Sequence, residues 1–179
     1  MGGTHIDGVL IHQGEIMKVT KSPTDPSNML ESILEALKHL LAGQDPSQIE
    51  RIILSTTICT NAIVENKTDP VGMIIECGPG LANDFLRCGR ENIFISGYID
   101  HRGREVSPID PGEIRHAVEI LKKHGISAVA VTGKFSVRNN EHEIKINEMI
   151  KDKFSPITLG HTVSGKLNFP RRVFTSYYN

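Results

Sequence analysis

The stretch from residue 110 to residue 161 alternates helical and strand patterns, which restricts the fold more than any other feature of the chain. Asp110 and Glu113 form a start resembling a capping box, and Gly125 follows the end of the apolar stripe. These signals predict helices at 113–124 and 139–154 and strands at 126–133 and 156–161. Because this order is typical of strands joined by right-handed helical crossovers, we predict an α/β fold with a mainly parallel or mixed sheet flanked by helices.

The first hundred residues repeat the same two patterns less regularly. Asp25 is a candidate N-cap and Pro26 a first helical residue for an amphipathic stretch that ends before Gly43. Two extended runs around Gln13-Gly14 indicate a hairpin. We therefore expect a hairpin within 4–22, a helix at 29–42, buried strands at 51–57 and 70–77, and a strand, turn and strand over 92–109 with the turn at 101–103.

Composition sets the class of protein. With 179 residues and 39% hydrophobic residues, the chain can bury the core of a single domain over residues 1–179. Lys plus Arg number 20 against 21 Asp plus Glu, so no basic field favours nucleic acid or membrane as a partner. Cys59, Cys77 and Cys88 lack paired spacing and no apolar run approaches about 20 residues, so we expect a cytoplasmic protein.

Residues 2–4 are the first candidate for ligand binding. Gly2 and Gly3 allow a phosphate to approach the backbone closely, and Thr4 adds a hydroxyl donor. The competing interpretation is a plain turn before the hairpin.

The second candidate is the polar stretch STTICTN, residues 55–61, at the expected end of a strand. Ligands collect at such positions in open α/β sheets. The competing interpretation is that one threonine caps a helix and the others are solvated. The hydroxyl and amide groups belong to Ser55, Thr56, Thr57, Thr60 and Asn61.

No residue can be assigned a catalytic role from spacing, and no metal site is predicted. The eight histidines show neither HxH nor HExxH spacing, so most are expected at the surface. His142 lies between two glutamates at an expected helix start, where capping or solvation is the main interpretation and a metal-ligand role the lesser one.

Four stretches together resemble, in the same order, the amino-terminal domain of the hydantoinase/oxoprolinase family. They are GGTHIDGVLI, KVTKSPTDPSNML, STTICTNAIVENK and KFSVRNNEHEIKINEMI. The family includes ATP-dependent N-methylhydantoinase subunits, 5-oxoprolinase and acetone carboxylase subunits, and the resemblance covers essentially the whole chain. It implies a ribonuclease H-like fold of the actin-type ATPase class.

The resemblance also implies that Gly2, Gly3 and Thr4 form a turn that contacts nucleotide phosphates. In the family an Asp precedes this turn on a central strand, and residues 171–179 resemble the passage into a second, larger domain. We therefore expect a domain fragment truncated at both ends, although the sequence leaves open whether Met1 is a genuine start. His5, Ile6 and Cys59 depart from the residues usual in the family at these positions.

By resemblance, the parent protein is an ATP-dependent hydrolase that opens C–N bonds of cyclic amides such as hydantoins or 5-oxoproline. ATP and Mg²⁺ are the implied cofactors, and Asp7 is the nearest acidic residue, unless it only bonds its own backbone in the hairpin. The candidate cofactor-binding residues are Gly2, Gly3, Thr4, Asp7, Thr56, Thr57 and Asn61.

The implied partners are the remainder of the parent chain or a second hydantoinase-type subunit, and a small cyclic amide as substrate. The alternative is a non-catalytic regulatory or assembly module with an actin-like core, and a sugar-kinase-like parent ranks third. The substrate, the metal and the oligomeric state cannot be read from the sequence, and the isolated chain is expected to be inactive.

Overall fold

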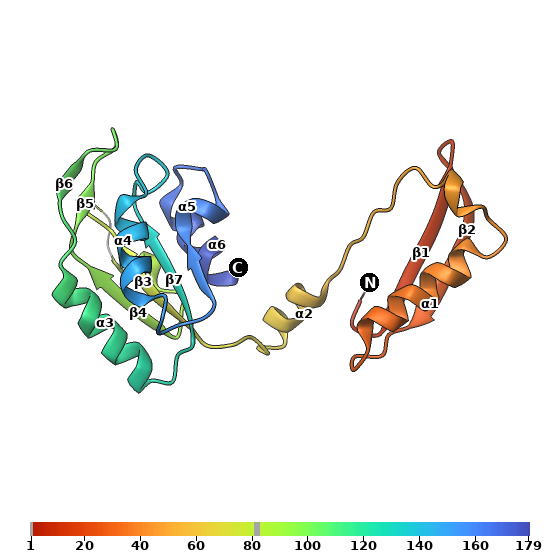
Figure 1. The fold of residues 1–179 in the computed structure, drawn as a ribbon, viewed down its shortest axis with the longest axis horizontal. Helices are drawn as coiled ribbons and strands as arrows, with labels where there is room; N and C mark the ends of the chain where they lie inside the picture. Colours follow the sequence, from red (N-terminus) through yellow and green to blue (C-terminus); the bar gives the residue numbers. More distant parts are fainter. Residues whose placement is uncertain (1, 81–82) are drawn as a thin grey trace. The chain divides into compact units, whose positions relative to one another are not determined.

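The computed structural model describes residues 2–80 and 83–179, so Met1 lies outside the described residues. The chain divides between Thr68 and Asp69 into two compact units, each of which is described by itself (Figure 1). The expectation of a single domain over 1–179 stays a prediction. No helix in the described part of the chain is long and apolar enough to cross a membrane.

The first unit is built on a β-hairpin. Strands β1 (His5–His12) and β2 (Glu15–Pro23) pair antiparallel. Gln13 and Gly14 form the tight turn between them, with positive φ values of 52° and 86°. Helix α1 (Met29–Leu41) packs on the hairpin (Figure 1). The 3₁₀ helix η1 (Pro46–Gln48) and the short helix α2 (Ile58–Val64) complete the unit.

Two details of α1 differ from expectation. Its N-cap is Asn28, whose side chain accepts a hydrogen bond from Glu31 N, whereas Asp25 accepts from Ser27 N in the preceding turn. The helix also packs on an antiparallel hairpin rather than on a parallel sheet. Asn and Asp both cap helices well, so side-chain type alone could not decide between them.

The prediction of a strand at 51–57 is wrong. These residues form neither helix nor strand, although they lead directly into α2 as expected. Ile52, Ile53 and Leu54 are 60%, 80% and 73% exposed. An apolar run becomes a strand only when a neighbouring backbone edge pairs with it, and none of the described strands does so.

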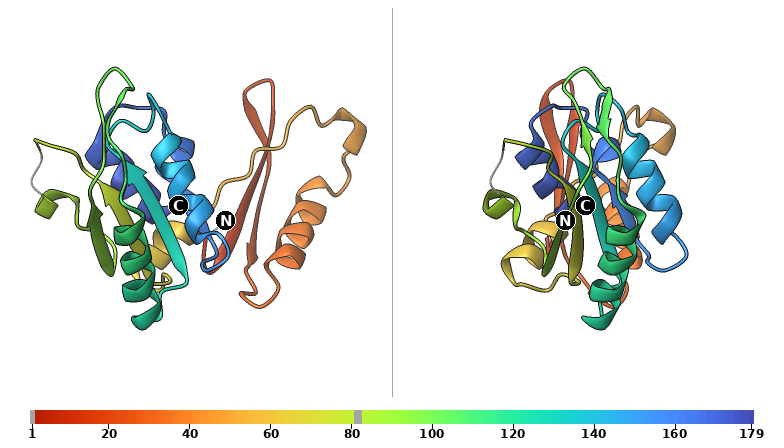
Figure 2. Two further views of the ribbon diagram at one scale, coloured as in Figure 1. Left: turned by 60° about the vertical axis from the view of Figure 1, so that its left-hand side comes forward. Right: turned by 90° about the vertical axis from the view of Figure 1, so that its left-hand side faces the viewer.

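The second unit is an α/β layer structure with a parallel sheet in the order β4-β3-β7-β8 (Figure 2). Its strands are β3 (Val71–Glu76), β4 (Glu91–Ile95), β7 (Ala128–Gly133) and β8 (Ile157–Leu159). Its helices are η2 (Asn83–Leu86), α3 (Pro111–Lys123), α4 (Glu141–Ile150), α5 (Gly160–Val163) and α6 (Phe169–Tyr178). A small hairpin joins β5 (Tyr98–Ile99) to β6 (Glu105–Ser107).

Alternate residues of the central strands fill two cores, one on each face of the sheet. Ile74 faces a cluster that includes Ile114 of α3 and Ile146 of α4. Met73 and Ile75 face the opposite cluster, which contains Phe169 and Val173 of α6. This arrangement confirms the α/β fold class with a sheet flanked by helices.

Candidate functional site

The glycine turn at residues 2–4 is held by backbone hydrogen bonds. Gly2 N donates to His5 O at 2.8 Å, and Thr24 N donates to Thr4 O at 2.9 Å. The Thr24 hydroxyl also donates to Gly2 O at 3.4 Å. The turn is therefore fixed to the start of β1 and to the residue that follows β2.

The polar stretch before and inside α2 lies directly against this turn. A Cβ atom on Gly3 would lie 3.3 Å from Asn61 Nδ2, and one on Gly2 would lie 3.9 Å from Thr57 Oγ1. Thr57 occupies the N-cap position of α2, yet its side chain makes no capping hydrogen bond. The first unit thus brings together Gly2, Gly3, Thr57 and Asn61, which the sequence suggested as parts of one site. Their binding role stays a prediction.

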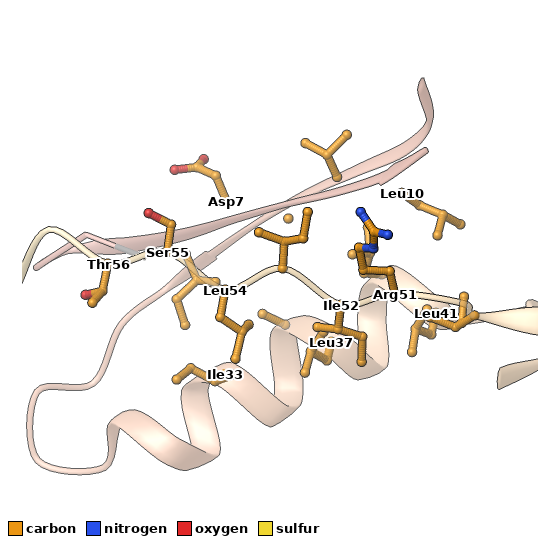
Figure 3. Close-up of a pocket in the computed structure, with 17 residues that line it drawn as sticks. Asp7, Leu10, Ile33, Leu37, Leu41, Arg51, Ile52, Leu54, Ser55 and Thr56 are labelled. Atoms are coloured by element: carbon orange, nitrogen blue, oxygen red, sulfur yellow. The ribbon is translucent and has the colours of Figure 1, made fainter. Parts of the chain in front are cut away.

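A pocket of about 400 Å³ adjoins β1 in the same unit. Figure 3 shows Asp7, Ser55 and Thr56 at one end of it, while apolar side chains such as Leu37 line the rest. The Asp7 carboxylate is two-thirds exposed and lies 3.7 Å from Lys21 Nζ. Asp7 and Thr56 therefore line the same pocket.

The second unit contains a buried polar network that the sequence analysis missed. His142 is 1% exposed, with Nδ1 3.1 Å from Glu76 Oε1 and Nε2 3.0 Å from Glu105 Oε2. Burial raises the pKa of Glu76, whereas the hydrogen bond from His142 lowers the pKa of Glu105.

The neighbouring residue extends this network. Glu143, also 1% exposed, accepts hydrogen bonds from Gly133 N and His161 N, and lies 2.5 Å from His161 Nδ1. The fully buried Arg172 of α6 donates to the carbonyls of Gly133, Lys134 and Lys166. The network therefore ties the end of β7 to α4, α5 and α6.

The network is packed rather than open. A Cβ on Gly160 would lie 2.7 Å from Thr132 Cγ2 and 2.9 Å from Glu143 Oε1. Thr132 Oγ1 and Arg172 Nε are buried without a hydrogen-bond partner among the described residues. No group of three or more His, Cys, Asp or Glu within residues 2–80 and 83–179 is arranged to hold a metal ion. The geometry is that of a structural network, which holds helices against the carboxyl edge of the sheet.

The expectation that His142 serves in capping or is solvated is wrong, and the sequence did carry a signal against it. Residues 142, 146 and 150 are spaced by four, which places His142 in line with Ile146 and Ile150 on the buried face of α4. A histidine at that spacing indicates a buried side chain that needs polar partners.

Comparison with known proteins gives the family directly. Residues 1–154 match the hydantoinase/oxoprolinase N-terminal region. The chain belongs to this family. Among curated relatives, this family member is 26% identical to the caprolactamase subunit alpha of Pseudomonas jessenii, over 99% of the chain and 30% of that protein. It is also 26% identical to the acetophenone carboxylase gamma subunit of Aromatoleum aromaticum, over 98% of the chain and 29% of that protein.

Solved structures agree with the fold of this hydantoinase/oxoprolinase domain. The ATP-dependent caprolactamase from Pseudomonas jessenii matches 99% of the chain and 30% of its own, with a TM-score of 0.69 and 26% identity. An acetone carboxylase in its nucleotide-free form matches with a TM-score of 0.78 and 19% identity, again over 99% of this chain and 30% of that one. The chain spans about a third of the length of the relatives it matches.

The family match includes every candidate residue of the nucleotide site but only part of the buried polar network. All seven candidate cofactor-binding residues fall within residues 1–154, as do Glu76, His142 and Glu143. His161 and Arg172 of the buried network lie beyond the matched stretch.

Proposed function

We propose that this chain is the amino-terminal part of an ATP-dependent hydrolase that opens C–N bonds of cyclic amides. In this proposal the glycine turn, with Thr56, Thr57 and Asn61, contributes part of the nucleotide-phosphate site. The observation that carries the proposal is the close approach of Gly3 to Asn61: a Cβ atom on Gly3 would lie 3.3 Å from Asn61 Nδ2, which is tighter than an ordinary contact.

The chemistry of these residues suits a phosphate. Backbone N–H groups of a glycine turn can point at an anion without a side chain in the way, and Thr4 and Asn61 add hydroxyl and amide donors. One match to a solved structure supports the reaction class, since the 26% identical caprolactamase is described as ATP-dependent and a lactam is a cyclic amide.

The residues present fit part of an ATP and Mg²⁺ site. ATP would supply the phosphoryl group that activates the amide carbonyl oxygen, and Mg²⁺ would neutralise phosphate charge. Asp7, beside Ser55 and Thr56, offers one carboxylate toward the metal. Mg²⁺ usually keeps several waters and needs only one or two carboxylates, so phosphates, water and other parts of the parent protein would complete its shell.

The proposed partners are the remainder of the parent chain or a second hydantoinase-type subunit, in the cytoplasm. The matched caprolactamase and acetophenone carboxylase proteins are both named as subunits, which supports an assembled enzyme. The alternative is a regulatory or assembly module with the same core and no hydrolysis. An assay for ring opening of 5-oxoproline, hydantoin or caprolactam by the assembled parent protein distinguishes the two functions. Ring opening would support the hydrolase, and its absence would support the module.

The phosphate site can be tested on the chain itself by a ligand-observed NMR titration with ATP and Mg²⁺. Gly3→Val places two further carbons against Asn61 and should weaken binding at least about tenfold, by removing the close approach of the phosphate. Gly165→Val is the matched control, because a Cβ at Gly165 meets no atom within 4 Å. Equal binding by the two variants would contradict the proposal.

A further inference from the structure

We propose that the second unit has an anion-binding site of its own, at the carboxyl edge of its sheet between β3 and β7. The Lys134 side chain and the glycine loop at residues 77–80 bind a phosphate group carried by a small molecule. The glycine turn at residues 2–4 and α2 belong to the first unit, so this proposal does not depend on the nucleotide site proposed above.

The first support is the order of the strands in the parallel sheet. In the order β4-β3-β7-β8, the chain passes from β3 to β4 on one side of β3 and returns to β7 on the other side. The segments that follow β3 and β7 also cover opposite faces, because Leu86 of η2 belongs to one core and Ile146 of α4 to the other. The two loops therefore diverge at the carboxyl edge, and open parallel sheets bind ligands at such a point.

The second support is the glycine loop, Cys77-Gly78-Pro79-Gly80, which directly follows β3. Gly78 and Gly80 have positive φ values of 56° and 93°, which glycine adopts without strain. The backbone N–H groups of these two glycines donate to no other residue that the structure describes. Gly80 is exposed and Gly78 half-buried, so an anion from solvent can approach this backbone without meeting a side chain of the glycines.

The third support is the position of Lys134 beside the glycine loop. Its ammonium group donates to Pro79 O, and a Cβ atom on Gly80 would lie 3.8 Å from Lys134 Nζ. An ammonium group carries three N–H donors, so two remain for a ligand. A phosphate at this place would meet both a positive charge and backbone N–H groups, which is the combination that binds phosphates in other glycine loops.

The fourth support is the way the buried polar network fixes the backbone of Lys134. The Lys134 N–H donates to Glu76 O, and its carbonyl accepts a hydrogen bond from Arg172. Gly133, the preceding residue, is held by Arg172 and by the Glu143 carboxylate. Burying charged groups such as Arg172 and Glu143 is costly. Here it gives a partly exposed lysine the rigid support that a ligand-binding residue requires.

The fifth support is the charge of the loops around this place. The β5–β6 hairpin lies against the loop that follows β7, since Asn139 Nδ2 donates to Gly103 O at 3.1 Å. The acidic side chains of the hairpin, Asp100 and Glu105, already pair with basic side chains. Three basic side chains in these loops pair with no carboxylate in the described part of the chain, and their charge attracts an anion. They are Arg102, Lys134 and Arg138.

The test is a two-dimensional NMR titration of the full chain with inorganic phosphate as the probe, at an ionic strength kept constant with sodium chloride. The amide signals of Gly78, Gly80 and Lys134 should shift and saturate. Lys134→Gln should weaken this binding at least about tenfold, because a hydrogen bond between charged groups is lost. Lys153→Gln is the matched control and should bind normally, since Lys153 Nζ also donates to a main-chain carbonyl but lies between α4 and the amino end of β8.

A second variant keeps the test readable if Lys134→Gln alters the glycine loop. Arg138→Gln leaves Lys134 in place and should weaken phosphate binding about twofold, with a smaller effect at high salt, because it removes only a nearby charge. Amide signals of Gly78 and Gly80 that do not saturate with phosphate would overturn the proposal. Equal binding by Lys134→Gln and the unchanged chain would also overturn it.

The same titration distinguishes this site from the nucleotide site of the first unit. Phosphate bound at the first unit shifts the amide signals of residues 2–4 and 57–61, and Gly3→Val should reduce those shifts alone. Shifts confined to residues 2–4 and 57–61 would overturn the present proposal and leave the proposed function standing. Shifts confined to the glycine loop and Lys134 would do the reverse.

Discussion

The Arg172 side chain is buried at the centre of the second unit, where it forms hydrogen bonds with main-chain carbonyls instead of with water. Its guanidinium donates to three carbonyl oxygens, and burial lowers its pKa from the ordinary arginine value. Arg172→Met should lower the free energy of unfolding by about 3 kcal/mol, because buried carbonyls lose their donors. Urea denaturation followed by tyrosine fluorescence measures this change, since all three tyrosines lie in the second unit.

The neighbouring arginine is the control for this prediction. Arg171 is exposed, so Arg171→Met should change the free energy of unfolding by no more than about 0.5 kcal/mol. Similar losses from both variants would mean that the carbonyl contacts of Arg172 contribute little.

A second residue, Asp100, gives the β5–β6 hairpin a dependence on pH. Backbone N–H groups of the 102–104 turn and the Arg104 guanidinium bond its carboxylate and lower its pKa from 3.8 to about 2. A carboxyl group whose pKa is lower in the folded than in the unfolded state stabilises the folded state at pH values above its unfolded pKa. This stabilisation is lost as the pH falls through the folded-state pKa. Asp100→Asn should therefore speed hydrogen exchange of residues 98–107 at pH 6, and less so toward pH 2 after correction for intrinsic exchange. Asp152→Asn, at an exposed site, should show neither effect.

At the scale of elements, α1 depends on a cap that the sequence did not single out. Asn28 Oδ1 accepts from Glu31 N, so Asn28→Ala should destabilise the helix by about 1 kcal/mol. Faster hydrogen exchange across residues 29–41 would report this loss. Glu35→Ala, on the exposed face of the same helix, should leave exchange unchanged, and equal acceleration in both variants would rule out a specific capping effect.

Most elements were predictable because their signals are local. Asp110 caps α3 through Gly112 N, Gln13-Gly14 makes the tight turn of the first hairpin, and the apolar runs at 71–76 and 128–133 become buried strands. Residues 51–57 carry the same local signal and form no strand. Strand pairing needs a second backbone edge, which lies outside the segment being analysed.

At the scale of the whole molecule, the chain matches only part of each of its relatives. It covers about 30% of the relatives it matches. We expect the 179-residue chain alone to show no measurable ATP hydrolysis and no opening of hydantoin rings. Phosphoryl transfer requires positioning and charge stabilisation from several directions, and one missing donor already costs roughly 10²–10³ in rate. A phosphate-release assay with ATP and Mg²⁺ checks this expectation, and clear turnover would place the active site within these residues.

The α/β class, the helices with both ends marked and the family could be predicted from the sequence, because caps, periodicity and motifs are properties of neighbouring residues. The tertiary structure was needed to show that Gly3 lies close to Asn61, that residues 51–57 form no strand, and that His142 and Glu143 are buried with charged partners. Glu76 lies 66 residues from His142 along the chain, and Arg172 lies 39 from Gly133. Such pairs are fixed by the order of strands in the sheet and by which helices cover it, which no local pattern specifies.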